Sequence, residues 1–143
     1  MKILSAVLLC VLMLLPALAL AEEAAPIDDD QKPAVEAAKT WLTGIDAGAY
    51  AKSWPEASAH FKGAVSQKDW ETALTAFRKP LGTLVSRQVT KAKSLSSLPG
   101  APDGAYVVME FAASFSNKKE AFETVAFSRE ADGVWRAAGY FIR

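Results

Sequence analysis

The clearest pattern in the chain is a regular alternation of apolar and mixed positions over residues 106–115. Successive side chains of a β-strand point to opposite faces, so this pattern predicts a strand with one continuous apolar face. That face holds Val107, Met109, Phe111, Ala113 and Phe115. Because it carries no polar side chain, we expect it to be buried against other elements.

The same two-residue period predicts strands over residues 83–95, 121–130 and 134–143, separated by turns at 98–104, 116–119 and 131–133. Short connections join antiparallel neighbours, so the four strands form a meander. The last hairpin can turn over Asp132-Gly133 or over all of Ala131 to Gly133. These two turns bring opposite strand faces together, and the sequence leaves both open.

Ahead of Gly82 the apolar residues follow a helical period in three stretches. The first runs from Ala34 to Gly48, the second begins at Ser53 with Glu56 completing a capping box, and the third begins at residues 66–69 and ends before Pro80. The fold class is therefore α+β, with three N-terminal helices packed on a four-stranded antiparallel sheet. The other sheet face points to water or to a pocket.

The amino terminus has the features of a secretory signal. Lys2 precedes an apolar run over residues 3–15, Pro16 interrupts it, and Ala19-Leu20-Ala21 provides the small residues of a cleavage site. We expect cleavage between Ala21 and Glu22, which makes the product periplasmic or secreted. An uncleaved anchor and a lipoprotein signal at Cys10 are the alternatives, but the Ala-x-Ala cleavage motif and the bulky Leu9 argue against them. Residues 22–33 are an acidic leader that we expect to be flexible, and residues 34–143 form a single domain.

The composition limits which partners the protein can bind and which reactive groups it can offer. Basic and acidic residues are equal at 16 each, which gives no electrostatic basis for binding nucleic acid or an anionic membrane. Membrane contact is expected only through the transient signal. Cys10 is the single cysteine and is removed with the signal, so the mature domain offers neither a disulfide nor a thiol nucleophile. We expect no metal, because potential ligands do not cluster, and no cofactor.

Charged residues within apolar strand positions are the first candidates for a site. We place Arg87, Glu110, Glu123 and Arg136 on the outer sheet face, where they either line a cavity or form cross-strand pairs in contact with water. Arg78 stands at the end of the third helix, where a cation complements the helix dipole. Aromatic side chains left over from the core can line an opening. The candidate binding residues are Tyr50, Trp54, Arg78, Arg87, Glu110, Glu123, Arg136 and Tyr140.

Several motifs together resemble a known bacterial exported family, the one labelled domain of unknown function 4019. They include Asp46-Ala47-Gly48-Ala49-Tyr50, Ser53-Trp54, Arg78-Lys79-Pro80-Leu81-Gly82 and Trp135-Arg136-Ala137-Ala138-Gly139-Tyr140. The resemblance spans about residues 34–143 and says little about function. The helix that ends Asp-x-Gly-x-Tyr and leads into Ser-Trp is also loosely similar to nuclear-transport-factor-two-like domains. That likeness implies a cone-like fold whose curved sheet wraps a pocket.

Two functions are compatible with these residues. The first is a non-catalytic periplasmic binding or accessory domain that holds a small ligand or a partner protein. The second is a cone-fold acid–base enzyme of the isomerase, dehydratase or hydrolase type, in which Glu110 or Glu123 is the general base near Tyr140 or Arg87. The enzyme hypothesis rests on analogy and requires one of these carboxylates to lie in a pocket.

The signal prediction can be tested by expressing the full chain in a Gram-negative bacterium and measuring the intact mass of the exported protein. We expect the mass of a chain that begins at Glu22. An Ala21→Arg variant serves as the control and retains residues 1–21, because the peptidase requires a small residue there. A wild-type product that keeps residues 1–21 contradicts the prediction.

Overall fold

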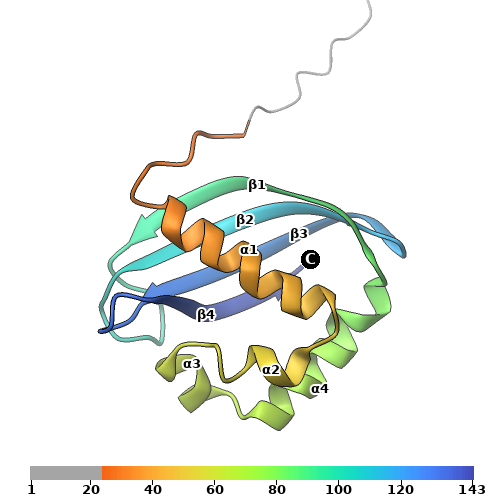
Figure 1. Ribbon diagram of the computed structural model, residues 1–143, viewed down its shortest axis with the longest axis horizontal. Helices are drawn as coiled ribbons and strands as arrows, with labels where there is room; N and C mark the ends of the chain where they lie inside the picture. The colour runs from red at the N-terminus through yellow and green to blue at the C-terminus, as the bar shows by residue number, and fades with distance from the viewer. Residues whose placement is uncertain (1–23) are drawn as a thin grey trace, which may run out of the picture.

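Helices precede strands along the whole described chain. The computed structural model describes residues 24–143, so the predicted signal peptide lies outside the described residues. The helices are α1 (Lys32–Asp46), α2 (Tyr50–Ser53), α3 (Ala59–Ala64) and α4 (Gln67–Phe77), followed by the short 3-10 helix η1 (Lys79–Leu81). The strands are β1 (Leu84–Leu95), β2 (Tyr106–Phe115), β3 (Lys118–Arg129) and β4 (Trp135–Ile142). They form one antiparallel sheet in the order β1-β2-β3-β4, as the period-two pattern predicts (Figure 1).

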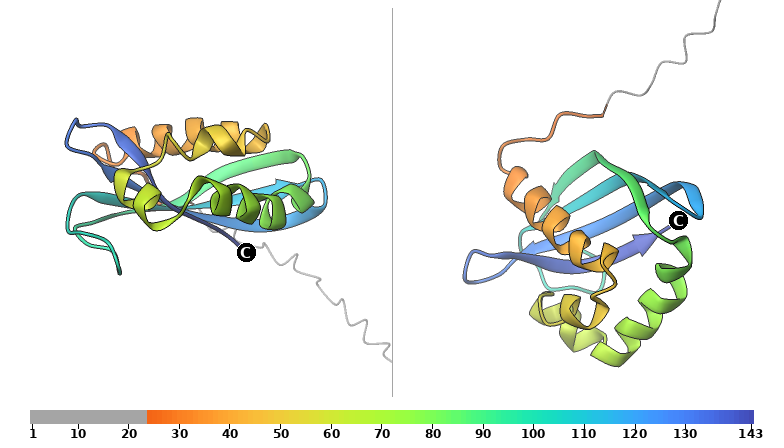
Figure 2. Two further views of the ribbon diagram at one scale, coloured as in Figure 1. Left: turned by 90° about the horizontal axis from the view of Figure 1, so that it is seen from below. Right: turned by 45° about the vertical axis from the view of Figure 1, so that its right-hand side comes forward.

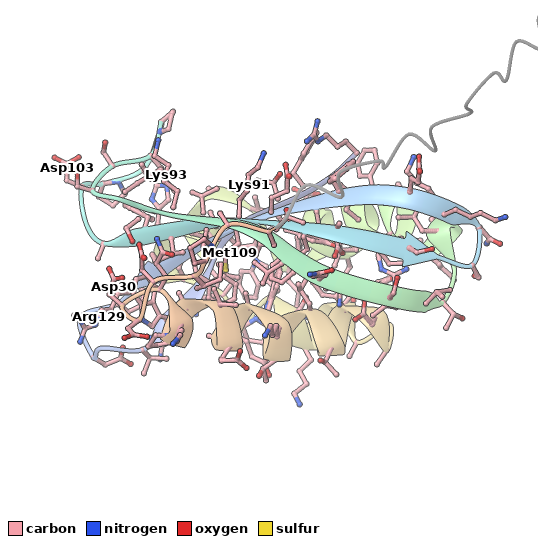
Figure 3. All side chains as sticks on the ribbon, turned by 90° about the horizontal axis from the view of Figure 1, so that it is seen from above. Asp30, Lys91, Lys93, Asp103, Met109 and Arg129 are labelled. Carbon is pink, nitrogen blue, oxygen red and sulfur yellow. The ribbon has the colours of Figure 1, made fainter. Side chains whose placement is uncertain are left out.

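The predicted apolar face of β2 is the centre of the core. Val107, Met109 and Phe111 are at most 1% exposed. The long helix α1 runs across this side of the sheet, whereas the opposite side is left open (Figure 2). Figure 3 shows Met109 between α1 and the sheet, with Lys91 and Lys93 of β1 projecting on the other side. The prediction that this row is buried under the helices is confirmed.

Helix α1 begins two residues before its predicted start at Ala34. Pro33 lies in its first turn, where the missing amide costs nothing, and Gln31 just before it is buried with its side chain donating to the carbonyl oxygen of Ala92. The leader therefore contacts the sheet at its last residues. After the helix, Gly48 adopts a φ of 77° and the chain reverses toward α2. No helix within residues 24–143 is long and apolar enough to cross a bilayer.

The structure has four α-helices where the sequence predicted three. The second helix was expected to begin at Ser53, but α2 ends at that residue and the next helix, α3, begins at Ala59. Ser53 ends α2 and does not cap: its hydroxyl donates to the Tyr50 carbonyl at 2.7 Å and accepts from Trp70 Nε1 at 2.9 Å. Ser58 is the cap instead, accepting from the Phe61 amide at 3.1 Å. Between the two helices, Ala57 forms a bridge with Ala137 of β4.

The last hairpin adopts the three-residue turn. The Glu130 amide donates to the Val134 carbonyl at 2.9 Å, and Gly133 has the positive φ that such a turn requires. Further along β4, Ala137 pairs with Phe127 and Gly139 with Ala126, which leaves Ala138 as an extra, bulged residue. The bulge shifts the alternation by one position, so Tyr140 points to the same side of the sheet as Ala137.

The importance of the β2 row can be tested by comparing two phenylalanines in a urea unfolding titration. Replacing the fully buried Phe111 by alanine leaves a cavity and lowers the free energy of unfolding by about 3–5 kcal/mol. Phe122 lies on the open face, so Phe122→Ala lowers it far less. Equal losses in the two variants would contradict the assignment of the two faces.

Candidate functional site

Four charged side chains meet under the helices, and Arg87 is at their centre. Its guanidinium donates to both oxygens of Glu123 at 2.6 and 2.9 Å, and to both oxygens of Asp46 at 2.6 and 2.9 Å. Arg87 comes from β1, Glu123 from β3 and Asp46 from the last residue of α1. The planar guanidinium thus makes two bidentate contacts, the geometry that suits arginine and carboxylate best.

Arg78 makes the second link to Asp46. Its Nη2 donates to Asp46 Oδ1 at 3.2 Å, and its Nη1 donates to the Gly82 carbonyl at 2.7 Å. The guanidinium carbon also lies 4.4 Å from the centre of the Phe115 ring. Arg78 is the C-cap of α4, the helix-end position predicted for it, and its side chain is almost entirely buried. Two cations and two carboxylates therefore balance within the network.

Tyr140 completes the network from β4. Its hydroxyl donates to Glu123 Oε1 at 2.5 Å, and Glu123 itself is 0% exposed. Burial raises the pKa of Tyr140 far above its usual value, and the charge of Glu123 raises it further. Burial alone would lower the pKa of Arg87, but the hydrogen bonds to Asp46 and Glu123 outweigh this and raise it. Tyr140 is therefore held neutral and Arg87 is held charged.

The network ties the end of α1 and the end of α4 to three strands of the sheet. Both Glu123 oxygens already accept hydrogen bonds, from Arg87 and from Tyr140. A buried charge in this setting is stable only while its partners remain in place. The arrangement therefore fixes the helices on the sheet, and it leaves Glu123 no free oxygen for proton transfer to a substrate.

An apolar pocket lies beside the network, between α4 and the carboxy-terminal part of β4. Its volume is about 230 Å³, and its lining residues are Trp70, Ala73, Leu74, Phe77, Tyr140, Phe141 and Ile142. Tyr140 belongs to both features, since its ring lines the pocket while its hydroxyl reaches Glu123. Two of the lining residues, Phe77 and Phe141, are largely exposed to solvent, at 72% and 62%.

Four of the eight candidate residues come together in the structure: Arg78, Arg87, Glu123 and Tyr140. The prediction that Arg87 and Glu123 face outward is wrong, because they share the inner face with Val89 and Val125. Sequence reasoning also missed Asp46 as a site residue. Its position was a usable signal, because a carboxylate at the C-terminus of a helix is opposed by the helix dipole and needs a cation nearby.

The other four candidates lie elsewhere. Glu110 is on the open face, where it accepts from Arg143 at 3.0 Å. Arg136 pairs with Asp132 of the last turn at 2.7 Å, and this hydrogen bond lowers the pKa of Asp132 to about 2. Tyr50 and Trp54 are half-buried packing residues, and the Trp54 indole donates to the Val65 carbonyl at 2.7 Å. Across residues 24–143, no cluster of three or more His, Cys, Asp or Glu side chains is placed to hold a metal ion.

A protein-family model described as "Protein of unknown function (DUF4019)" matches residues 37–140. The chain belongs to the DUF4019 family. The matched range contains all five residues of the charge network in this DUF4019 protein, from Asp46 to Tyr140. The resemblance inferred from the sequence motifs is thereby confirmed.

Among solved structures, this DUF4019 protein is similar to Aln2 from a Streptomyces species. The two chains are 10% identical, the TM-score is 0.50, and the match covers 82% of this chain and 92% of Aln2. At that identity the likeness concerns the fold alone. No curated protein matches the chain.

The Tyr140–Glu123 hydrogen bond predicts a specific response to alkaline pH. The folded pKa of Tyr140 is raised above its unfolded value of about 10, so its contribution to stability is complete below pH 10 and is lost as the pH rises further. Tyr140→Phe costs about 1–3 kcal/mol at neutral pH, because Glu123 loses a donor. Above pH 10 the difference between wild type and variant shrinks by about 1.4 kcal/mol per pH unit.

The measurement is urea unfolding of both proteins between neutral pH and about pH 11. Tyr50→Phe is the matched control, since Tyr50 is only half-buried. This control corrects for effects that follow from removing any tyrosine hydroxyl. A constant difference for Tyr140→Phe would show that the hydroxyl is not held by Glu123.

Proposed function

We propose that this chain is an exported, non-catalytic binding domain whose apolar pocket between α4 and β4 receives an uncharged group of a small ligand or of a periplasmic partner protein. The observation that carries the proposal is the pocket itself, about 230 Å³ of apolar space with no charged residue among its lining. The exposed rings of Phe77 and Phe141 support it, because exposed apolar groups that gather around a cavity mark binding sites.

The state of the two candidate acids favours binding over catalysis. A general base must reach the proton it abstracts, directly or through one water. Glu123 is fully enclosed and its oxygens are occupied by Arg87 and Tyr140. Glu110 lies on the open face, where Arg143 and the Thr90 hydroxyl contact its carboxylate. The acid–base enzyme implied by a cone-like fold is therefore the weaker candidate.

Export is the part of the proposal that rests on the amino-terminal sequence. The apolar run over residues 3–15 and the small residues at 19–21 support release of the domain into the periplasm or beyond the cell. The domain was predicted to fold without a disulfide, which fits a compartment where cysteine oxidation is otherwise a hazard. A partner in that compartment would meet the pocket directly.

Uptake of an apolar group can be tested with N-phenyl-1-naphthylamine, an uncharged dye whose fluorescence rises in apolar surroundings. Wild-type protein should bind the dye, and Ala73→Trp should weaken binding about tenfold or more by filling the pocket. Thr72→Trp is the matched control, because Thr72 is exposed and lies outside the pocket lining.

Thermal unfolding of both variants verifies that each remains folded. The proposal is contradicted if wild type does not bind the dye. It is also contradicted if Ala73→Trp binds the dye as well as wild type and the control Thr72→Trp do.

A further inference from the structure

The carboxy-terminal half of β4 has a free hydrogen-bonding edge. Phe122 and Arg143 exchange both backbone hydrogen bonds, each at 3.0 Å. Paired residues in an antiparallel ladder alternate between bonded and non-bonded pairs, so Phe141 bonds to β3 while Tyr140 and Ile142 do not. The amide and carbonyl groups of Tyr140 and Ile142 therefore point away from the sheet. Among residues 24–143, no backbone hydrogen bond to another element satisfies them.

The other edges of the sheet are protected. The edge strand β1 is interrupted by bulges at Val85 and Thr90 and carries Lys91 and Lys93, devices that discourage a further strand from pairing (Figure 3). The first half of β4 is covered by the Ala57 bridge, where the Ser58 amide donates to the Ala137 carbonyl at 2.8 Å. Beyond Ala138, residues 139–142 of β4 carry no charge and no proline. Within residues 24–143, this short stretch combines an open ladder with apolar side chains.

The open edge and the apolar pocket are the same place. Tyr140 and Ile142 of β4 line the pocket together with residues of α4. Figure 1 shows α4 beside the end of β4. We infer that this half of β4 binds an extended, uncharged segment of a partner protein by strand addition, with apolar side chains of that segment entering the pocket. This inference rests on the proposed binding function and names the partner for it.

The chemistry of the site selects this occupant. The free amides and carbonyls are matched by another polypeptide backbone, whereas an acyl chain or an aromatic ligand would leave them unpaired. The volume of about 230 Å³ is below the roughly 300–1,000 Å³ of pockets that enclose drug-sized ligands, and so suits individual side chains. No lining residue is charged, so the complementary segment is uncharged as well. Because α4 flanks the edge, a single strand enters more readily than the sheet of a second copy.

The experiment uses the mature chain, residues 22–143, and a fluorescent peptide of about seven residues that alternates valine and threonine between solubilising lysines. The matched peptide has the same sequence with every valine and threonine N-methylated, so it keeps the side chains but cannot pair. We expect the first peptide to bind about tenfold more tightly than the second. Its binding should slow amide hydrogen exchange at Tyr140 and Ile142 about tenfold.

Two variants locate the binding on the protein. Ile142→Pro removes an amide that β3 does not use, so the sheet is retained while strand addition is lost. Ile142→Ala keeps the amide and removes only side-chain contacts, so its loss of affinity should be smaller. Thermal unfolding of both variants confirms that they are folded, and the peptide pair remains a test if the proline variant is not.

The outcomes distinguish failure of the strand-addition proposal from failure of the proposed binding function. Equal binding of the two peptides overturns strand addition and leaves the apolar pocket as the binding site. Binding of N-phenyl-1-naphthylamine without binding of either peptide has the same meaning. Failure of both the dye and the peptides overturns both proposals. A concentration-dependent dimer of the mature chain that Ile142→Pro abolishes assigns the edge to a second copy and overturns the partner segment.

Discussion

The structure depends on the charge of Arg87 being compensated where water does not reach it. Taking a guanidinium and two carboxylates out of water is costly, and removing one partner of such a group typically destabilises a protein by about 3–5 kcal/mol. Asp46 and Glu123 compensate Arg87 only when the end of α1 lies over β1 and β3. The ion network thus specifies where the first helix docks, a choice that apolar packing of Val107, Met109 and Phe111 alone leaves less defined.

The same network sets the environment of the apolar pocket. Tyr140 uses its hydroxyl on Glu123 and turns its ring toward Trp41 and Trp70, at centroid distances of 5.7 and 6.4 Å. The Tyr140 side chain is consequently held by the hydrogen bond of its hydroxyl and by the packing of its ring. A pocket with one immobile wall loses less conformational entropy on binding than one whose wall must be ordered, and this favours a preformed site on β4.

Much of the fold could be predicted from the sequence, because the signals were local and strong. The alternation over residues 106–115 and the turn at Gly133 predicted strands that the structure confirms closely. The second helix was predicted wrongly because Ser53 and Ser58 are both capable caps, and only the tertiary contact of Ser53 with Trp70 decides between them. The faces of Arg87 and Tyr140 were unpredictable for a related reason. Bulges at Val85 and Ala138 shift the two-residue period, and no residue type at these positions predicts a bulge.

The bulge at Ala138 has a consequence for how this strand tolerates change in length. One residue fewer at that point would restore a simple alternation, yet Gly139 would still pair with Ala126 and Tyr140 with Val125, so the last side chains of β4 would keep their faces. Tyr140 would remain on the inner side of the sheet, and Glu123 would keep its hydrogen-bond donor. The unpaired alanine thus lets β4 lose one residue without a change of register beyond it, a tolerance that the regular ladder of β2 with β3 over residues 106–113 does not have.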